Sequence, residues 1–322
     1  WWGYNYIRNV NDLIAKLPAA GISDEEKKSL LGEAKFIRAF YYFGLAKRYG
    51  GVPIIKEVQN YTGNNIGELQ VPRNTEKEVW DFIAADLDSA VTLLPETNTA
   101  GRATKYVALA LKSRAMLYAG SVAKYGTVSL NGIVGISASE ANKYWQASFD
   151  ASEQVINAKK FSLYNKNPDK ELNFAQSFLD SDNPEAIFSV YYQYPYKTHS
   201  YDASNLPFGI RGPGGSGSNI GPSLEMVEQY EYTDGSAGKL KIKNPDGSPV
   251  FYNKTTDLFL NKDPRCLATV IVPFGQFAGK VVDVQAGIYD RNVKVEAGDY
   301  SALYNPVTHK PDNVNGTLHI VG

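Results

Sequence analysis

Hydrophobic residues recur at helical spacing in the first half of the chain, between clear helix boundaries. Ser23 and Glu26 fit a capping box, in which the two side chains satisfy backbone amides at a helix start. Apolar residues follow at helical spacing as far as Leu45, and Gly50 and Gly51 then interrupt the pattern. This pattern predicts one long helix that is buried on most sides.

Further helices are expected before residue 160. One starts at a capping box in residues 75–78, one near Thr104, and one after a capping box in residues 137–140. Another is expected around residues 4–17. Helices in this order are typical of antiparallel hairpins of the tetratricopeptide type, although their uneven spacing does not establish a repeat.

The pattern changes after residue 160, where Asn-Pro pairs and Asp-Gly turns recur. Three runs have β-strand character: residues 186–192, 267–272 and 280–284. One short helix is expected at residues 222–230. The sequence therefore predicts a mainly α protein in two parts. Residues 1–160 form a helical scaffold, and residues 161–322 form a loop-rich region with small sheets, packed on the scaffold as one unit.

Composition narrows the class of protein. The 322 residues include 33 Lys and Arg against 34 Asp and Glu, so the chain lacks the basic excess that a nucleic-acid binder uses to neutralise phosphates. With 43% hydrophobic and 12% aromatic residues it can bury a substantial core. Its longest apolar runs are far below the roughly 18 residues that a membrane-spanning helix needs.

The glycine-rich segment and the single cysteine carry little chemistry. Residues 212–217 have the G-x-G-x-x-G spacing, but no strand precedes them and no helix follows directly, so a flexible loop is the better interpretation. Cys266 excludes an internal disulfide and is interpreted as a small buried hydrophobic residue. Trp80 and Trp145 stand at core spacing on helices and are assigned to packing.

Metal and catalytic signals are equally weak. His199, His309 and His319 have no second ligand at metal-binding spacing. Residues 180–183 begin like a calcium loop, but Glu185 stands where that loop requires glycine. We therefore expect no cofactor and no metal, and no residue is singled out as catalytic.

One aromatic stretch stands out in the loop-rich region. Tyrosines are dense in residues 191–201, and the chain around them is rich in Pro, Gly and Ser, where packing does not need so many rings. Exposed rings can stack on the CH faces of sugars, while polar neighbours bind the hydroxyl groups. The candidate ligand-binding residues are Tyr194, Tyr196, Tyr201, Phe208, Arg211 and Asn205. The alternative is that these rings pin a long loop to the body of the protein.

Residues 32–43, followed by Tyr49-Gly50-Gly51-Val52-Pro53, resemble the SusD/RagB family. These are surface lipoproteins of Bacteroidetes that capture nutrients, usually glycans. Further segments resemble the family in the same order: residues 71–87, 101–104, 184–188, 222–235 and 262–265. The resemblance covers most of residues 1–285.

The resemblance implies right-handed helix pairs of tetratricopeptide type that support a variable, loop-rich region. It implies a non-catalytic, glycan-binding protein that delivers oligosaccharides to a TonB-dependent transporter of the SusC type. It also implies lipid anchoring at the outer membrane in the full-length protein. The lipobox cysteine and the usual C-terminal segment are absent here, so we expect this chain to be the central portion of a longer protein.

Two other functions stay open at this stage. A glycoside hydrolase on a helical scaffold would share the aromatic subsites but would need two carboxylates roughly 5–9.5 Å apart in a cleft. An adaptor of the tetratricopeptide type would bind a peptide on its concave helical face.

Overall fold

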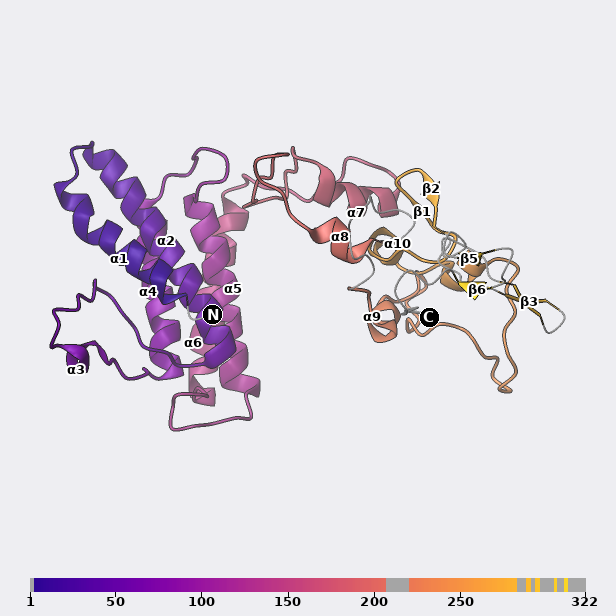
Figure 1. Ribbon diagram of the computed structural model, residues 1–322, viewed down its shortest axis with the longest axis horizontal. Coiled ribbons are helices and arrows are strands. Elements are labelled where there is room, and N and C mark those ends of the chain that lie inside the picture. The colour runs from indigo at the N-terminus through magenta and orange to yellow at the C-terminus, as the bar shows by residue number, and fades with distance from the viewer. Residues whose placement is uncertain are drawn as a thin grey trace. The chain divides into compact units, whose positions relative to one another are not determined.

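The computed structural model describes residues 3–206 and 220–282, and the backbone of four short strands beyond them (Figure 1). The chain divides into two compact units. We call the first, Trp1–Leu163 with Pro184–Tyr191, the helical unit. We call the second, Tyr164–Asn183 with Tyr192–Gly322, the loop-rich unit.

The helical unit is built from successive helices that pack against their neighbours in the sequence: α1 on α2, α2 on α4, α4 on α5 and α5 on α6. Its described helices are α1 (Tyr4–Lys16), η1 (Leu17–Ala19), α2 (Asp24–Tyr49), α3 (Ile66–Leu69), α4 (Glu76–Leu93), α5 (Lys105–Tyr125), η2 (Ala138–Glu140) and α6 (Ala141–Asn157).

Two of the expected capping boxes are present. The Ser23 side chain accepts a hydrogen bond from the Glu26 amide at the start of α2, and the Glu26 carboxylate accepts one from the Ser23 amide at 3.0 Å. Thr75 and Glu78 do the same at the start of α4. The predicted start of α5 at Thr104 is also confirmed, because its side chain accepts the Val107 amide.

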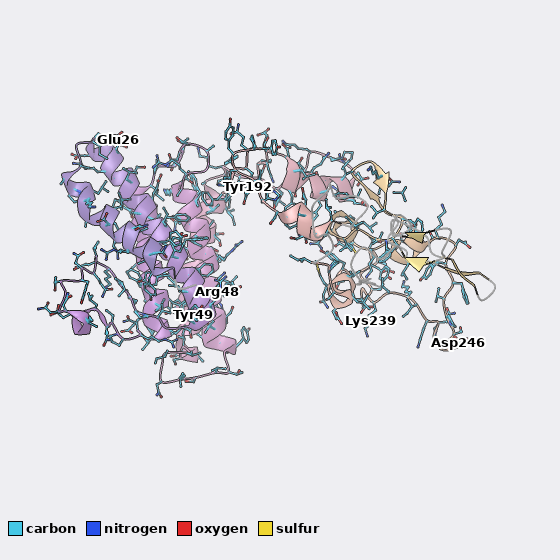
Figure 2. The ribbon with its side chains drawn as sticks, in the orientation of Figure 1. Glu26, Arg48, Tyr49, Tyr192, Lys239 and Asp246 are labelled. Carbon is cyan, nitrogen blue, oxygen red and sulfur yellow. The ribbon has the colours of Figure 1, made fainter. Side chains whose placement is uncertain are left out.

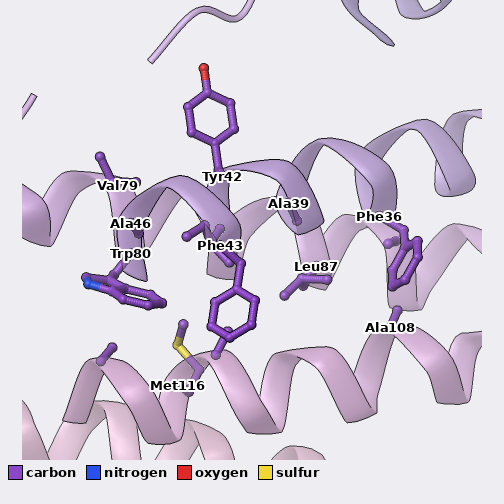
Figure 3. Packing of buried hydrophobic residues seen from close by; sticks show 14 of the residues in the cluster. Phe36, Ala39, Tyr42, Phe43, Ala46, Val79, Trp80, Leu87, Ala108 and Met116 are labelled. Carbon is purple, nitrogen blue, oxygen red and sulfur yellow. The ribbon is translucent and has the colours of Figure 1, made fainter. Parts of the chain in front are cut away.

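The core of the helical unit lies between α2, α4 and α5 (Figure 3). Phe43 points into it and contacts Trp80 edge to face, with ring centroids 5.9 Å apart. Tyr42 points to the other side of α2, and its hydroxyl accepts the Ile55 amide at 2.7 Å. Helix α2 is therefore tied both to its neighbouring helices and to the chain that follows it, although Phe40 on its outer face is half exposed.

The turn that follows α2 requires glycine at positions 50 and 51. Gly50 has φ +68°, a conformation that side chains disfavour. A Cβ atom on Gly51 would lie 2.0 Å from the Asn74 carbonyl oxygen. The turn also receives the Arg73 guanidinium, whose Nε donates to the Gly51 carbonyl at 2.7 Å. The close approach of these two segments requires glycine.

The loop-rich unit has short elements. Its described helices are α7 (Lys170–Leu179), α8 (Tyr201–Asn205), α9 (Leu224–Gln229), η3 (Thr255–Phe259) and α10 (Pro264–Thr269). Its described strands form three antiparallel pairs: β1 (Gln276–Phe277) with β2 (Lys280–Val281), β3 (Ile288–Asp290) with β4 (Val293–Val295), and β5 (Tyr304–Asn305) with β6 (Lys310–Pro311).

The loop-rich unit contains a small buried apolar cluster. Val227, Cys266, Val270 and Val272 are buried together. Burial raises the pKa of the Cys266 thiol, as expected for a thiol that acts as a hydrophobic residue. The interpretation of Cys266 as a buried small residue is confirmed.

Two predicted strands are wrong. Residues 267–269 belong to α10, because Asp263 caps the helix and Pro264 fits its first turn, and these local signals outweigh the β-branched residues that follow. Residues 186–192 form no strand; most of this segment belongs to the helical unit, where Phe188 contacts Phe36 edge to face at 5.9 Å. Of this segment, Ile187 is partly buried and packs against the core of the helical unit. The strand expected at residues 280–284 is present as β2, and residues 283–284 lie outside the described residues.

The capping box expected at residues 137–140 is also wrong. The Ser137 hydroxyl pairs with the Ser139 hydroxyl at 2.8 Å rather than with a backbone amide. A single turn, η2, results, and α6 starts at Ala141.

The mainly α fold class with short strands is confirmed. Among the described residues, no helix has both the length and the apolar character that crossing a bilayer requires.

Candidate functional site

A tight turn carries two of the predicted tyrosines, and we call it the tyrosine turn (residues 193–197). Gln193 and Lys197 bond to each other through both of their backbone groups, with N–O distances of 2.9 and 2.8 Å. This antiparallel bridge fixes the ends of the turn and places Tyr194 and Tyr196 in its tip. The Tyr194–Pro195 peptide bond is cis.

The two rings at the tip project into solvent. Tyr194 is 86% exposed and Tyr196 is 87% exposed. Side chains that pinned the loop to the body would be largely covered. The turn is instead held by its own backbone, and both rings are open to a ligand.

Three other side chains support the base of the tyrosine turn. The ring of Tyr192, labelled in Figure 2, contacts His199 edge to face with centroids 4.8 Å apart. The Lys197 ammonium lies 5.4 Å from the centroid of the Tyr192 ring. His199 Nδ1 accepts the Tyr201 amide at 3.2 Å, which leaves the ring proton on Nε2 when the imidazole is neutral. The half-buried Tyr192 ring therefore packs against His199 and Lys197, while the Tyr194 and Tyr196 rings are exposed to solvent.

Helix α8 follows the turn and holds two further candidates. Tyr201 is its first residue and is 67% exposed. The Asn205 side-chain amide donates to the Tyr201 carbonyl at 2.9 Å, so Asn205 stabilises the helix that carries this tyrosine. Within the described residues, the structure thus brings four of the six candidates into one segment of the loop-rich unit.

The other two candidates, Phe208 and Arg211, lie outside the described residues. The same holds for the glycine-rich segment, residues 212–217, and for His309 and His319.

The acidic segment that begins like a calcium loop has a different role. Lys166 donates to Asp180 at 2.8 Å and reaches the Asp182 carboxylate at 3.4 Å. The hydrogen bond from Lys166 lowers the pKa of Asp180, so the carboxylate stays ionised and paired with a protein cation. Among the described residues, no group of His, Cys, Asp and Glu side chains is arranged to hold a metal ion.

The sequence predicts Tyr194 and Tyr196 as candidates, but it does not predict the side chains that contact Tyr192 at the base of the turn. Lys197 and His199 lie in the same run of sequence, but their contacts with Tyr192 depend on the folding of the turn. The signal that could have found them is the spacing of four residues between Gln193 and Lys197 around Pro195, which is typical of a short hairpin-like turn.

Comparisons with known proteins agree with this architecture. Residues 2–117 match a family model described as "Starch-binding associating with outer membrane", and residues 184–318 match one described as "SusD family". A SusD-like protein of Bacteroides ovatus is 25% identical over 240 residues, which are 73% of this chain and 40% of that protein.

Solved structures show the same fold. The crystal structure of a SusD-like protein from Bacteroides fragilis matches with a TM-score of 0.66 at 25% identity, over 92% of this chain and 52% of that one. A SusD-like carbohydrate binding protein from the same species matches with a TM-score of 0.63 at 19% identity, over 87% of this chain and 47% of that one.

The chain has the tetratricopeptide-like helical fold of these proteins, with a loop-rich part that carries an exposed aromatic turn. It belongs to the SusD/RagB family. It spans about half or less of the length of the proteins it matches.

Proposed function

We propose that this chain is the glycan-binding portion of a non-catalytic nutrient-capture protein. It binds oligosaccharides by stacking sugar rings on the exposed tyrosines of the tyrosine turn. The observation that carries the proposal is the nearly full exposure of Tyr194 and Tyr196 on a turn whose ends are fixed by two backbone hydrogen bonds. A fixed turn loses little conformational entropy when a ligand binds, so the rings are preorganised.

The physical chemistry of the turn favours a sugar over a hydrophobic peptide. Two separate rings on a polar, solvent-exposed turn offer flat apolar faces without an enclosing groove. Such faces suit the alternating CH and OH surfaces of a pyranose, while peptide side chains are bound in apolar pockets or grooves. Tyr201 extends the aromatic surface, and we assign Phe208, Arg211 and Asn205 to the same site as neighbours in the sequence.

The similarities support the same class of ligand. The family model that matches the helical unit is described as starch-binding, and one structural neighbour is a carbohydrate binding protein. We propose that the full-length protein is lipid-anchored at the outer membrane. There it would pass oligosaccharides to a SusC-like TonB-dependent transporter, with residues 1–160 as scaffold and residues 161–322 as binding region of one SusD-like unit.

The proposal is tested with a panel of soluble plant, host and microbial polysaccharides. Binding is measured by calorimetry, and reducing ends are measured in the same samples. We expect binding to one class of polysaccharide without release of reducing ends. Release of reducing ends would show a glycoside hydrolase instead, and absence of binding to every glycan would favour a peptide ligand.

A further inference from the structure

The loop-rich unit contains a cavity of about 260 Å³ that is separate in sequence from the tyrosine turn, and we call it the Tyr232 cavity. Its wall is formed where two segments pair. Tyr232 and Lys262 form an antiparallel bridge, and the Thr233 amide donates to the Asn261 carbonyl at 2.8 Å. The cavity is also lined by Lys241, Tyr252, Asp257 and Leu258. Backbone hydrogen bonds therefore hold the lining in place.

A buried aromatic residue, Tyr232, is part of the lining of this cavity. Tyr232 is 6% exposed, so its ring is fixed by packing. The Lys241 ammonium lies 4.3 Å from the ring centroid and the Lys262 ammonium lies 4.7 Å from it. A cationic ligand would have to approach a ring whose negative electrostatic potential is already used by two lysines. The Tyr232 ring is therefore not free to bind a cationic ligand.

Two carboxylates at the same cavity disfavour anions. Asp234 accepts the Ser236 amide at 2.9 Å through Oδ1, and Asp257 accepts the Lys254 amide at 3.1 Å through Oδ2. Each carboxylate has two oxygens with further acceptor capacity, and hydrogen bonds from neutral hydroxyl groups to ionised carboxylates are strong. Hydrogen bonding from Ser236 lowers the pKa of Asp234, which keeps it ionised near neutral pH.

Tyr252 and Asn261 are two further residues of the cavity lining. The Tyr252 hydroxyl donates to the Lys241 carbonyl at 2.6 Å, which fixes one wall. Asn261 also lines the cavity, on a backbone with φ +61°. The cavity therefore offers apolar ring surface, anionic acceptors and amide and ammonium donors around one small volume.

We propose that the Tyr232 cavity binds a single neutral pyranose ring. The volume is below the roughly 300–1,000 Å³ of sites for drug-sized ligands, which limits the occupant to about one sugar ring. Carboxylates bind its hydroxyl groups, and the partly exposed Tyr252 ring packs against its CH face. The inference rests on the proposed glycan-binding function and adds to it a second subsite that is independent of the tyrosine turn.

The experiment uses monosaccharides of one ring size and different charge. Dissociation constants are measured by ligand-observed NMR for D-glucose, D-galactose and D-mannose, and for the charged analogues D-glucosamine and D-glucuronate. We expect at least one neutral hexose to bind. If that hexose is glucose, glucosamine and glucuronate should each bind more weakly than glucose. Failure of all three hexoses, or tighter binding of a charged analogue than of its neutral parent, would overturn the inference.

The chain offers a matched pair of control variants. Asp234-Gly235-Ser236 and Asp246-Gly247-Ser248 are both turns in which the aspartate accepts the serine amide at 2.9 Å, and of these two aspartates Asp234 lines the cavity. Asp234→Asn removes the anionic acceptor, so hexose affinity should fall by about tenfold or more. Asp246→Asn, at the position labelled in Figure 2, should leave it unchanged. Equal effects of the two variants would overturn the inference.

A third variant separates this inference from the proposed function. Tyr194→Ala with Tyr196→Ala removes any hexose binding at the tyrosine turn, and the hexose binding that remains should still depend on Asp234. If that double variant abolishes hexose binding and Asp234→Asn does not, the tyrosine turn is the only hexose site and the inference fails while the proposed function stands. If hexose binding depends on Asp234 but no polysaccharide binds, the proposed function fails on its own.

Discussion

At the scale of single residues, the helical unit contains a buried ion pair. Arg38 and Asp86 are 3% and 2% exposed. The guanidinium donates to both carboxylate oxygens, at 2.7 Å from Nε and 2.9 Å from Nη2, and also to Asn11 at 2.8 Å. The pair joins α2 to α4, and its geometry compensates for the loss of hydration of both charges.

Asp86→Ala should destabilise the protein strongly, because it leaves the Arg38 charge buried without its partner. We expect the free energy of unfolding to fall by about 3–5 kcal/mol, measured by urea denaturation. The matched control is Asp88→Ala in the same helix, where the carboxylate pairs with Lys112 at the surface and is 58% exposed. That change should cost less than about 1 kcal/mol. Similar losses in both variants would contradict the assigned role of Asp86.

Asp81 links α4 to α6 and makes the stability of the helical unit depend on pH. Burial acts to raise its pKa, but hydrogen bonds from Lys77, Lys143 and Tyr144 outweigh burial and lower the pKa below the ordinary carboxyl value. The Tyr144 hydroxyl donates to it at 2.9 Å. A carboxyl group whose pKa is lower in the folded state stabilises the fold above its ordinary pKa, and this contribution is lost as the pH falls through the lowered value.

We therefore expect the stability of the native protein to fall as the pH drops below about 4. Asp81→Asn should make that fall smaller while lowering stability at neutral pH. The measurement is a series of urea denaturation curves between neutral pH and the lowest pH at which the protein stays folded. Asp12→Asn is the control, because Asp12 forms an exposed pair with Lys16 within one helix. An unchanged pH profile in the Asp81 variant would contradict this assignment.

At the scale of elements, the contact between α5 and α6 depends on a residue with no side chain. A Cβ atom on Gly120 in α5 would lie 2.4 Å from Cδ1 of Trp145 in α6. The indole therefore packs directly on the backbone of the neighbouring helix. This is consistent with the assignment of Trp145 to packing, and the spacing of Trp145 alone could not have identified Gly120 as its partner.

Gly120→Ala should destabilise the protein by about 1–3 kcal/mol, because the added methyl group displaces the indole. Gly44→Ala in α2 should instead stabilise it by about 0.5–1 kcal/mol, since the nearest atom to the new Cβ is Arg48 Nη1 at 3.6 Å and alanine favours the helix. Both values come from thermal or urea unfolding. Opposite signs support the close approach of α5 and α6, and two stabilising substitutions would contradict it.

Short sequence patterns predict the start of a helix correctly where each side chain of the pattern finds a backbone amide. The boxes at Ser23 and Thr75 start helices because serine or threonine and glutamate each find a backbone amide. The third box failed because the Ser137 hydroxyl pairs with the Ser139 hydroxyl, an alternative that the pattern of residue types does not exclude. The β-branched residues after Cys266 favour a strand by composition, but Asp263 caps a helix and Pro264 fits its first turn.

At the scale of the whole molecule, the sequence predicted the change of texture near residue 160, and the structure divides the chain close to that point. The division is not simple in sequence, because Pro184–Tyr191 returns to the helical unit. Such a return depends on contacts between distant residues, for example Phe188 with Phe36, which composition cannot indicate. The assignment of residues 1–160 and 161–322 to scaffold and binding region stays a prediction.

The candidate site shows the same division between what sequence can and cannot provide. An excess of tyrosines in a segment rich in Pro and Ser indicated Tyr194 and Tyr196 from the sequence. Their exposure and the fixed turn beneath them depend on the Gln193–Lys197 pairing. The Tyr232 cavity was not predicted, because its lining comes from segments about 30 residues apart that only the fold brings together.

The central claim is that the tyrosine turn binds glycan, and affinity in a turn variant tests it most directly. The affinity of the native chain for the polysaccharide identified in the panel is compared by calorimetry with that of Tyr194→Ala with Tyr196→Ala. Tyr61→Ala is the control, since Tyr61 is a 61% exposed tyrosine in the helical unit. If each ring contributes about 0.5–1.5 kcal/mol, affinity should fall about 5- to 150-fold in the double variant and stay unchanged in the control. Equal affinity of the native chain and the double variant would contradict the account.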